Sequence, residues 1–361
     1  MKRRQFLATA TGGLAASALA APAIAQSAPE IRWRLQSAFP KSLDTLWGGA
    51  ETFSRLVSEL TDGRFQIQPF AAGEIVGTFQ VADAVADGTV EAGYATTYYY
   101  VGKDPTFALP CDFPFGPNAR QKTAWMYHGG GLDLCNEFFA KHKMYAVPAG
   151  NTGAQMGGWY RKEIKTVQDL QGLKMRIGGL GGQVLQRLGA VPQQISAGDI
   201  YPALERGTID AAEFVGPYDD EKLGFAKVAP FYYYPGWWDG GPLIHVMINI
   251  DRWNSLPKLY KTAVNAAAAQ TYVDVLAKYD ARNPAAVRRL VAAGAQLRPF
   301  SQELMDAALK SSNELYDEIS AKNPDFKKIY ESVRAFRNEE YLWFQVAEYA
   351  YDSFLIRSRA K

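Results

Sequence analysis

The feature that most constrains the fold of this chain is a ten-residue segment that occurs twice. Residues 84–93 read AVADGTVEAG, and residues 203–212 read ALERGTIDAA. Each copy has the pattern of a helix end, a glycine at the helix C-terminus and a short buried strand. A single copy would carry little weight, because this order is common in proteins. Two copies favour two domains built on the same plan, and a chain of 361 residues is long enough for two.

The residues that precede the first copy alternate between strand and helix patterns. Residues 31–36 and 65–70 alternate apolar and polar side chains, and residues 45–60 place apolar side chains at helical spacing. This order predicts an α/β fold with parallel sheets covered by helices. Ligands of such sheets bind beyond the carboxyl ends of the strands. Residues 94–100 and 213–218, which follow the two copies, are therefore candidates for a binding site.

The last part of the chain is helical in pattern, from about residue 249 onward. Its final segment, residues 326–361, threads aromatic side chains through charged ones. An amphipathic helix of this kind must bury its aromatic face against the body of the protein or against a second subunit.

The N-terminus has the pattern of an export signal. Residues 3–7 read RRQFL, a twin-arginine pattern, an Ala- and Gly-rich apolar stretch follows to residue 20, and residues 23–25 read AIA. A membrane anchor is the alternative, but the apolar stretch is shorter than the ~20 residues that a spanning helix needs. We therefore predict that residues 1–25 are a cleaved twin-arginine signal peptide and that the mature protein lies in the periplasm.

The charge of the mature chain excludes two classes of partner. Removal of residues 1–25 takes away Lys2, Arg3 and Arg4 and leaves 36 basic residues against 37 acidic ones, a net charge of −1. This balance provides no basic surface for nucleic acid or for an anionic membrane. We expect neither partner, and selectivity for an anion must then come from a few placed groups.

The two cysteines, Cys111 and Cys135, are too few for a disulfide framework. In an oxidising compartment they either pair with each other or remain two buried thiols. The sequence leaves both alternatives open, because it does not give their separation in space.

Three segments of the chain resemble a known family, the solute-binding proteins of TRAP (tripartite ATP-independent periplasmic) transporters. They are residues 170–177 (LQGLKMRI), 188–192 (LGAVP) and 203–210 (ALERGTID). The resemblance implies a two-lobed periplasmic binding protein fold, with a ligand cleft between the lobes and a long C-terminal helical segment. It also implies that the protein delivers its solute to membrane subunits.

The resemblance implies limits for the lobes. Lobe I is expected to comprise residues 26–149 with about 240–280, and lobe II residues 150–239 with about 281–325. Residues 326–361 would then form a C-terminal helix through which the protein forms a homodimer.

A narrower resemblance is to the branch of this family that binds 2-oxo monocarboxylates together with a cation. Residues 150–159 (GNTGAQMGGW), 216–224 (GPYDDEKLG) and 232–238 (YYYPGWW) carry it. Pyruvate, 2-oxobutyrate and the hydroxy acid lactate are all monocarboxylates with the single negative charge that such a site requires. The chain departs from relatives at two positions: Gln155 stands where acid-binding relatives often have a second arginine, and Phe214 stands where some close relatives have Trp.

Arg176 is the main candidate for binding a carboxylate. It ends a predicted strand, and its planar guanidinium can bind a carboxylate through two parallel hydrogen bonds. Composition alone would favour a surface arginine, but the resemblance implies that this position grips the ligand.

A cation site is expected beside it. Gln155 and Glu213 supply hard oxygens, which suit Na⁺ or Ca²⁺ rather than zinc, and the backbone of Phe214 is a further candidate ligand. The ligand carboxylate and Arg176 cancel, so Glu213 needs one positive charge, and a second acid, Asp239, would favour a divalent cation. A purely structural Glu213 is the alternative. We expect Arg176 and Glu213 to meet across the gap between the lobes.

Aromatic and amide side chains complete the expected site. Tyr99 and Tyr100 are favoured as ligand contacts and Tyr98 less so, because strand alternation would send the three to opposite faces. Asn151 is a further expected donor. Core packing competes with a ligand role for each tyrosine and for the pair Trp237–Trp238, which follows Pro235-Gly236. The amides of residues 178–182 (GGLGG) could receive an anion, but the segment lacks the spacing of a dinucleotide fingerprint.

The rival function is a periplasmic enzyme that acts on an oxo acid with the cation as Lewis acid. The sequence contains no G-x-S-x-G and no H-E-x-x-H motif, and His128, His142 and His245 lack the spacing of a metal site. We therefore predict a binding protein that carries out no reaction and uses no organic cofactor.

Overall fold

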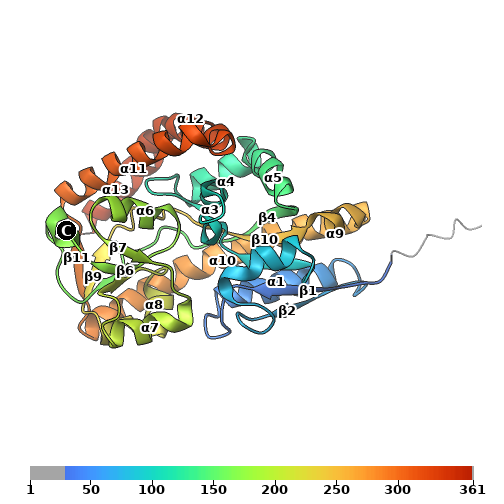
Figure 1. Ribbon diagram of the computed structural model, residues 1–361, viewed down its shortest axis with the longest axis horizontal. Coiled ribbons are helices and arrows are strands. Elements are labelled where there is room, and N and C mark those ends of the chain that lie inside the picture. Colours follow the sequence, from blue (N-terminus) through green and yellow to red (C-terminus); the bar gives the residue numbers. More distant parts are fainter. Residues whose placement is uncertain (1–28, 360–361) are drawn as a thin grey trace, which may run out of the picture.

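The computed structural model describes residues 29–359, so the predicted signal peptide lies outside the described residues. Two separate sheets organise the chain (Figure 1). The strands of the first, in the order β2-β1-β3-β10-β4, are β1 (Ile31–Ser37), β2 (Phe65–Phe70), β3 (Ala92–Ala95), β4 (Met144–Asn151) and β10 (Leu243–Asn249). The strands of the second, in the order β11-β9-β5-β8-β6-β7, are β5 (Trp159–Tyr160), β6 (Lys174–Arg176), β7 (Val191–Gln193), β8 (Ala211–Ala212), β9 (Phe231–Tyr234) and β11 (Gln296–Pro299).

Helices cover both sheets, as the α/β prediction requires. Those near the first sheet are α1 (Leu46–Glu59), α2 (Val81–Ala86), α3 (Ala108–Cys111), α4 (Ala119–His128), α5 (Gly131–Lys141) and α9 (Ile250–Ser255). Those near the second are α6 (Gly179–Arg187), α7 (Ala197–Glu205) and α8 (Pro217–Leu223). The long helices are α10 (Lys258–Ala292), α11 (Gln302–Lys322) and α12 (Pro324–Phe344), which a π-helical turn at Gln345–Tyr349 joins to α13 (Ala350–Ser358). We use lobe I and lobe II for the regions built on the first and second sheet; the residue limits of the lobes stay a prediction.

The repeated segment has the same local structure in both sheets. The first copy ends α2, turns at Gly88 with φ +80° and enters β3; the second ends α7, turns at Gly207 with φ +70° and enters β8. A left-handed φ is the conformation that glycine adopts without strain. The expected parallel pairing holds for β1 with β2 and β3, and for β6 with β7 and β8. It fails for β10 and β5, which run antiparallel to their neighbours because each enters its sheet from the other lobe.

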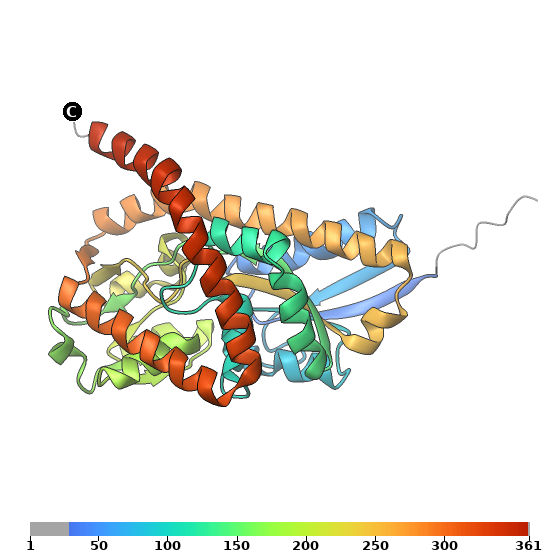
Figure 2. The same ribbon diagram turned by 90° about the horizontal axis from the view of Figure 1, so that it is seen from above.

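Two extended segments and one helix connect the lobes. The segment from β4 to β5 lies beside the segment from β9 to β10. Two backbone hydrogen bonds join them there: Gln155 N–H donates to Asp239 O at 3.1 Å, and Gly236 N–H donates to Gln155 O at 3.1 Å. Helix α10 packs its first part against α1 and β4 and its later part against α8 (Figures 1 and 2). The lobes therefore share a narrow, hydrogen-bonded hinge.

The C-terminal helices have two environments. The first half of α12 is anchored in the core through Phe326, Ile329, Tyr330 and Val333. The rest, with α13, crosses the body diagonally, and its end projects away from it (Figure 2). None of the helices within residues 29–359 combines the length and apolarity that crossing a bilayer demands.

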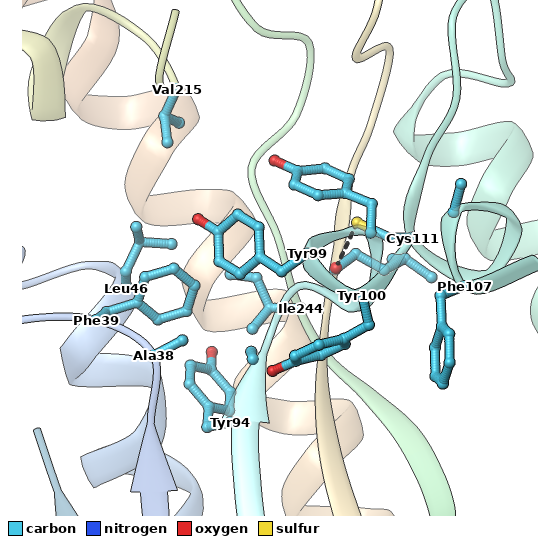
Figure 3. Close-up of a cluster of buried hydrophobic side chains, with 14 of the residues drawn as sticks. Ala38, Phe39, Leu46, Tyr94, Tyr99, Tyr100, Phe107, Cys111, Val215 and Ile244 are labelled. Carbon is cyan, nitrogen blue, oxygen red and sulfur yellow. Dashed lines mark hydrogen bonds between the residues drawn. The ribbon is translucent and has the colours of Figure 1, made fainter. Parts of the chain in front are cut away.

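Cys111 and Cys135 are both buried and unpaired. The Cys111 thiol donates to the carbonyl oxygen of Leu243 at 3.1 Å (Figure 3). Of the two alternatives that the sequence left open, the structure has two buried thiols.

Candidate functional site

The site is built where two neighbouring strands of lobe II end. Arg176 is the last residue of β6, and Glu213 directly follows β8. The two strands are parallel, and Arg176 pairs with Ala212 in register. Because the carboxyl ends of parallel strands meet at one edge of a sheet, the two side chains are neighbours. Both belong to lobe II, so the expectation that they meet across the gap between lobes is wrong.

Arg176 is buried, with 2% of its side chain exposed, and bonds to groups of the protein itself. Its Nη1 donates to Glu213 Oε1 and to Glu213 O, each at 2.6 Å, and its Nε donates to the carbonyl oxygen of Ile195 at 3.1 Å. The guanidinium also lies over the ring of Phe214, 5.3 Å from its centroid. The arginine is therefore a held cation and not a surface side chain.

Glu213 is an anion with an incomplete set of partners. Its Oε1 accepts from Arg176 and from the Gly178 amide at 3.0 Å, whereas the buried Oε2 has no hydrogen-bond partner. Burial raises the pKa of Glu213, and the charge of Arg176 offsets part of that rise. The glycine-rich segment thus directs an amide at an anion, as expected, but the anion present is a carboxylate of the protein itself. A buried carboxylate oxygen without a partner is costly unless something else fills the place.

Oxygen atoms from three segments converge beside Glu213. The amide oxygen of Gln155 faces Phe214 O and Asp239 Oδ2, at 2.9 and 3.3 Å respectively, while its nitrogen donates to Thr152 Oγ1 at 3.1 Å. An amide turned the other way would donate to both oxygens instead. Either hydrogens or a cation must separate oxygens that lie this close.

The donor set fits a hard cation. Burial and the nearby Glu213 and Asp112 carboxylates raise the pKa of Asp239 well above its ordinary value, and Arg176 offsets this only in part. One amide oxygen, one backbone carbonyl and two carboxylates are ligands that Na⁺ and Ca²⁺ accept. No group of three His, Cys, Asp or Glu side chains suited to a metal lies within residues 29–359. The four sequence-predicted cation ligands, Gln155, Glu213, Phe214 and Asp239, are thus brought together; the cation itself stays a prediction.

The three tyrosines lie in a 3₁₀ turn, Thr97–Tyr100, and not in the strand whose alternation we used to orient them. Tyr99 and Tyr100 still point in different directions (Figure 3). Tyr100 turns into lobe I and packs on Phe107, with ring centroids 5.8 Å apart. Tyr99 lies near Arg176, whose charge lowers the pKa of its hydroxyl against a larger rise caused by burial. The geometry keeps Tyr99 beside the site and directs Tyr100 away from it.

Tyr98 contacts lobe II directly. A Cβ added to Gly178 would lie 3.0 Å from Tyr98 Cε2, so the ring approaches this backbone more closely than a side chain would allow. Nearby, Gln194 Nε2 donates to Tyr99 O at 3.2 Å. These contacts join the lobes over the site, and Arg176 is buried because the lobes are closed.

Asn151 ends β4, and both hydrogens of its side-chain amide are already donated within the protein. Its Nδ2 donates to Gly241 O at 3.0 Å and to the Tyr272 hydroxyl at 3.1 Å, and its Oδ1 accepts from the Gly153 amide at 2.7 Å. A bound solute would have to replace one of these bonds. The ligand role of Asn151 stays a prediction, and its structural role is to fix the crossing segment.

The tryptophan pair faces both lobes. Trp237 stacks on Phe115 with ring centroids 5.5 Å apart, whereas Trp238 packs edge-on to Phe300 at 6.0 Å. Both indole Nε1 atoms are buried without a hydrogen-bond partner. The pair is buried at the hinge between the lobes. Its position there is compatible with both roles that the sequence left open, core packing and lining of the cleft.

A cleft of about 500 Å³ opens between the lobes in front of Arg176. Lobe I contributes Phe79, whose ring packs edge-on to Tyr99 at 5.3 Å, and lobe II contributes Ile195, whose carbonyl oxygen holds Arg176. The remaining lining residues are Pro40, Ala72, Gly73, Gly77, Thr78, Gln80, Gln194, Ser196, Ala197, Gly198 and Asp199. Ile195 therefore connects this cleft to the guanidinium, since it lines the cleft and its carbonyl oxygen accepts from Arg176 Nε.

Sequence reasoning missed the residues that support the oxygen cluster from behind. Asp112 accepts from the Gly241 amide at 2.7 Å, and its Oδ1 lies 3.7 Å from Lys122 Nζ; both side chains are fully buried. Thr152, the partner of Gln155, was missed as well. A buried ion pair between residues of α3–α4 has no signal in a single sequence, because the pairing depends on how those helices pack.

Comparison with known proteins agrees with this geometry. Residues 37–323 match the family model described as bacterial extracellular solute-binding protein, family 7. A monocarboxylate 2-oxoacid-binding periplasmic protein of Nostoc sp. is 49% identical, and the alignment covers 99% of this chain and all of the relative.

Two solved structures share the fold at high similarity. A TRAP transporter solute-binding protein of Bordetella bronchiseptica is 51% identical with a TM-score of 0.90, covers 92% of this chain and all of its own, and is described as a mixed-occupancy dimer with copurified calcium and picolinate in one active site. A TRAP periplasmic solute-binding protein of Pseudoalteromonas atlantica, solved with sodium and pyruvate, is 35% identical with a TM-score of 0.87 and covers 90% of this chain and 99% of its own.

These proteins are receptors of transporters and not enzymes, so the enzymatic alternative has no support. The expected binding protein fold and extracytoplasmic location are confirmed. The chain belongs to the family of bacterial extracellular solute-binding proteins, family 7, and is a solute-binding protein of the TRAP transporter type.

Proposed function

We propose that this protein binds a small 2-oxo monocarboxylate such as pyruvate, or a hydroxy acid such as lactate, together with Na⁺ or Ca²⁺, and delivers the solute to the membrane subunits of a TRAP transporter. The observation that carries the proposal is the pairing of a buried guanidinium with Glu213, whose second, buried carboxylate oxygen has no hydrogen-bond partner. A carboxylate suits the first group, and a cation suits the second. A solute with an oxygen next to its carboxylate can reach both.

Binding then exchanges partners within the site. In the closed structure Arg176 donates a hydrogen bond to one carboxylate oxygen of Glu213, and the second carboxylate oxygen of Glu213 has no partner. An incoming carboxylate takes the place of Glu213 on the guanidinium, and the cation takes over the charge of Glu213. Solute and cation are therefore expected to bind together, because each compensates a charge that the other leaves exposed.

The charges favour a divalent ion. Arg176 faces two acids, Glu213 and Asp239, so the site carries one net negative charge, and a monocarboxylate adds a second. Ca²⁺ neutralises both, whereas Na⁺ requires that Asp239 be protonated, which its raised pKa makes easier. Calcium in the Bordetella relative and sodium in the Pseudoalteromonas relative fit these two states.

We also propose that the protein is a homodimer through α12 and α13. Large apolar side chains on these helices are between 43% and 73% exposed: Tyr341, Leu342, Trp343, Val346, Tyr349, Tyr351, Phe354, Leu355 and Ile356. Large apolar side chains that gather in the exposed part of one helical segment mark an interaction site. The Bordetella relative is described as a dimer, which agrees with a second copy as the partner.

Calorimetry tests the proposed solute and cation together. The purified chain is stripped of ions and titrated with pyruvate in three buffers that contain Ca²⁺, Na⁺ or a chelator with choline as the only cation. Saturable binding with either ion and none in choline is the expected result. Equal affinity in all three buffers would contradict the cation, and no binding of pyruvate, lactate or 2-oxobutyrate in any buffer would contradict the solute class.

A further inference from the structure

One carboxylate of lobe I is held by three groups that belong to lobe II and the connecting helix. Asp44 lies in the loop before α1, in lobe I. The Tyr218 hydroxyl of α8 donates to its Oδ2 at 3.0 Å, and Arg282 Nη1 of α10 donates to the same oxygen at 3.0 Å. Lys222 of α8 donates to Oδ1. These bonds connect lobe I to lobe II and to α10, and none of them involves Arg176 or Glu213.

The three donors support one another. The ring of Tyr218 lies between two cations, 4.2 Å from Lys222 Nζ and 4.9 Å from Arg282 Cζ. Arg282 also donates to Thr45 Oγ1 at 3.1 Å. The aromatic ring keeps the two like charges in place by cation–π attraction, and the carboxylate between them offsets their repulsion.

Helix α8 presents these donors from a rigid base. Asp220 accepts from Trp159 Nε1 at 3.0 Å and from the Tyr232 hydroxyl at 2.7 Å, and Asp219 accepts from the Tyr279 hydroxyl at 2.6 Å. The two acids thus face inward and fix the helix to lobe II and to α10. The segment 216–224, which the sequence analysis singled out and the solute site does not use, divides into inward acids and a Tyr–Lys pair that faces lobe I.

We infer that Asp44 is an affinity-determining residue of the solute site although it contacts no solute. Its bonds to Tyr218 and Lys222 require the closed arrangement of the lobes, so they stabilise the closed state and not the open one. A contact that favours one of two states shifts the equilibrium by its differential free energy. The closed state retains solute, so loss of this contact raises the rate of release. This inference rests on the proposed function for the identity of the solute.

The size of the effect follows from exposure. The side chains of Asp44, Lys222 and Arg282 are 46%, 29% and 35% exposed. Solvent screens such pairs and a single one contributes little, but three donors on one carboxylate form a network. We expect a loss of affinity of about fivefold when Asp44 is neutralised at low ionic strength.

The test compares Asp44→Asn with wild type in pyruvate binding. Dissociation is followed by stopped-flow intrinsic fluorescence, and affinity by calorimetry, with Ca²⁺ and Na⁺ held constant while choline chloride is raised. The variant should release pyruvate about fivefold faster with little change in the association rate, and the difference should shrink as salt rises. The single substitution Lys222→Met should lower the affinity for pyruvate. Added to Asp44→Asn, it should lower the affinity no further.

Glu221→Gln is the matched control. Glu221 of α8 pairs with Arg289 of α10 through two bonds of 2.8 and 2.6 Å, but both partners lie on the lobe II side. This variant should bind as wild type does. Equal release rates for Asp44→Asn and wild type, or an equal loss in Glu221→Gln, would overturn the inference.

A second measurement separates this inference from the proposed function. If the wild-type protein binds no pyruvate, the proposed solute is wrong, and small-angle X-ray scattering of the ligand-free proteins then decides the role of Asp44. Asp44→Asn must have a larger radius of gyration than wild type and Glu221→Gln at low salt. Three identical radii would overturn the role of Asp44 in closure.

Discussion

The site and the C-terminal helix are opposite departures from ordinary burial. In the site, charged side chains such as Arg176 and Glu213 are almost fully buried. On the π-helical turn after α12 and on α13, side chains such as Val346 and Phe354 are 73% and 64% exposed. Buried polar groups and exposed apolar surfaces are the two informative exceptions to the general pattern of burial. Under the proposed function, a further molecule provides the environment that the side chains of each region suit: a solute with its cation in the first case and a second copy of the chain in the other.

Arg176→Ala should have the largest effect. It removes the carboxylate partner and leaves Glu213 buried and uncompensated, so pyruvate affinity should fall at least about hundredfold and the melting temperature should fall as well. Calorimetry and thermal unfolding measure the two. Arg176→Lys keeps the charge beside Glu213 and should fold as wild type does, while losing the two-pronged bond and much of the affinity.

Arg298→Ala is the matched control. Arg298 lies in β11 of lobe II and also pairs with a glutamate, Glu163, at 2.6 Å, but it lies near the surface. It should leave pyruvate binding unchanged. Unchanged pyruvate affinity in Arg176→Ala would contradict the assignment of Arg176 to the solute site.

The exposed region is tested by Val346→Glu combined with Phe354→Glu. Residues at the centre of an interface contribute about 2 kcal/mol or more each, so the pair should convert a dimer to a monomer in light scattering after size-exclusion chromatography. Truncation near residue 325 is unsuitable, because α12 begins with the buried side chains Phe326, Ile329 and Tyr330. The expectation that the whole segment 326–361 is an interface therefore needs adjustment: its first part is core.

Val273→Glu is the control for this change. Val273 is 59% exposed on α10 and remote in sequence from the C-terminal helices. Its substitution should leave the oligomeric state unchanged. A monomeric wild-type protein would contradict the proposed role of the exposed helix face.

Asp239→Asn should have an intermediate effect on pyruvate binding, and the size of the effect should differ between calcium and sodium. Loss of one carboxylate should weaken calcium-supported pyruvate binding on the order of tenfold, because calcium affinity follows the number of charged ligands. Sodium-supported binding should change less, since a protonated Asp239 already suits a monovalent ion. The comparison is made by calorimetry in each ion. Asp199→Asn, at the cleft mouth and outside the oxygen cluster, is the control, and an equal loss in both ions would contradict the charge argument.

The sequence predicted the parts of this site that depend on strand ends. Arg176 ends one recognisable strand and Glu213 follows another. Parallel pairing of those strands makes the two neighbours within lobe II, and not across the gap between the lobes as we expected. The repeated segment likewise predicted two sheets, because a glycine with left-handed φ ends each helix. Such features are local, so a single sequence contains them.

What the sequence did not predict depends on packing over long separations. Tyr98, Tyr99 and Tyr100 form a 3₁₀ turn, which short aromatic runs do not distinguish from a strand end. Asp44 meets Lys222 across 178 positions of sequence, and both are polar side chains of ordinary type. Only the closed arrangement of the lobes brings them together.

Substitution of Asp220 is expected to have the smallest effect on solute binding. Asp220 is an example of a buried acid that does not belong to the proposed binding site. Asp220 is buried like Glu213, but both of its oxygens accept bonds from the protein. Burial raises its pKa to about 7, against hydrogen bonds from Tyr232 and Trp159 that lower it. Its protonated form therefore favours the fold. This contribution to stability is complete below the ordinary pKa of an aspartate and is lost as the pH rises through about 7.

Asp220→Asn should thus flatten the fall in melting temperature between about pH 4 and pH 7 and change pyruvate affinity by less than about twofold. Thermal unfolding across this pH range and calorimetry at one pH measure the two effects. An amide can still accept from Trp159 and Tyr232, so the helix should stay in place. A loss of affinity comparable to that of Asp239→Asn would mean that α8 takes part in solute binding directly, and the distinction between a satisfied and an unsatisfied buried acid would then fail to locate the site.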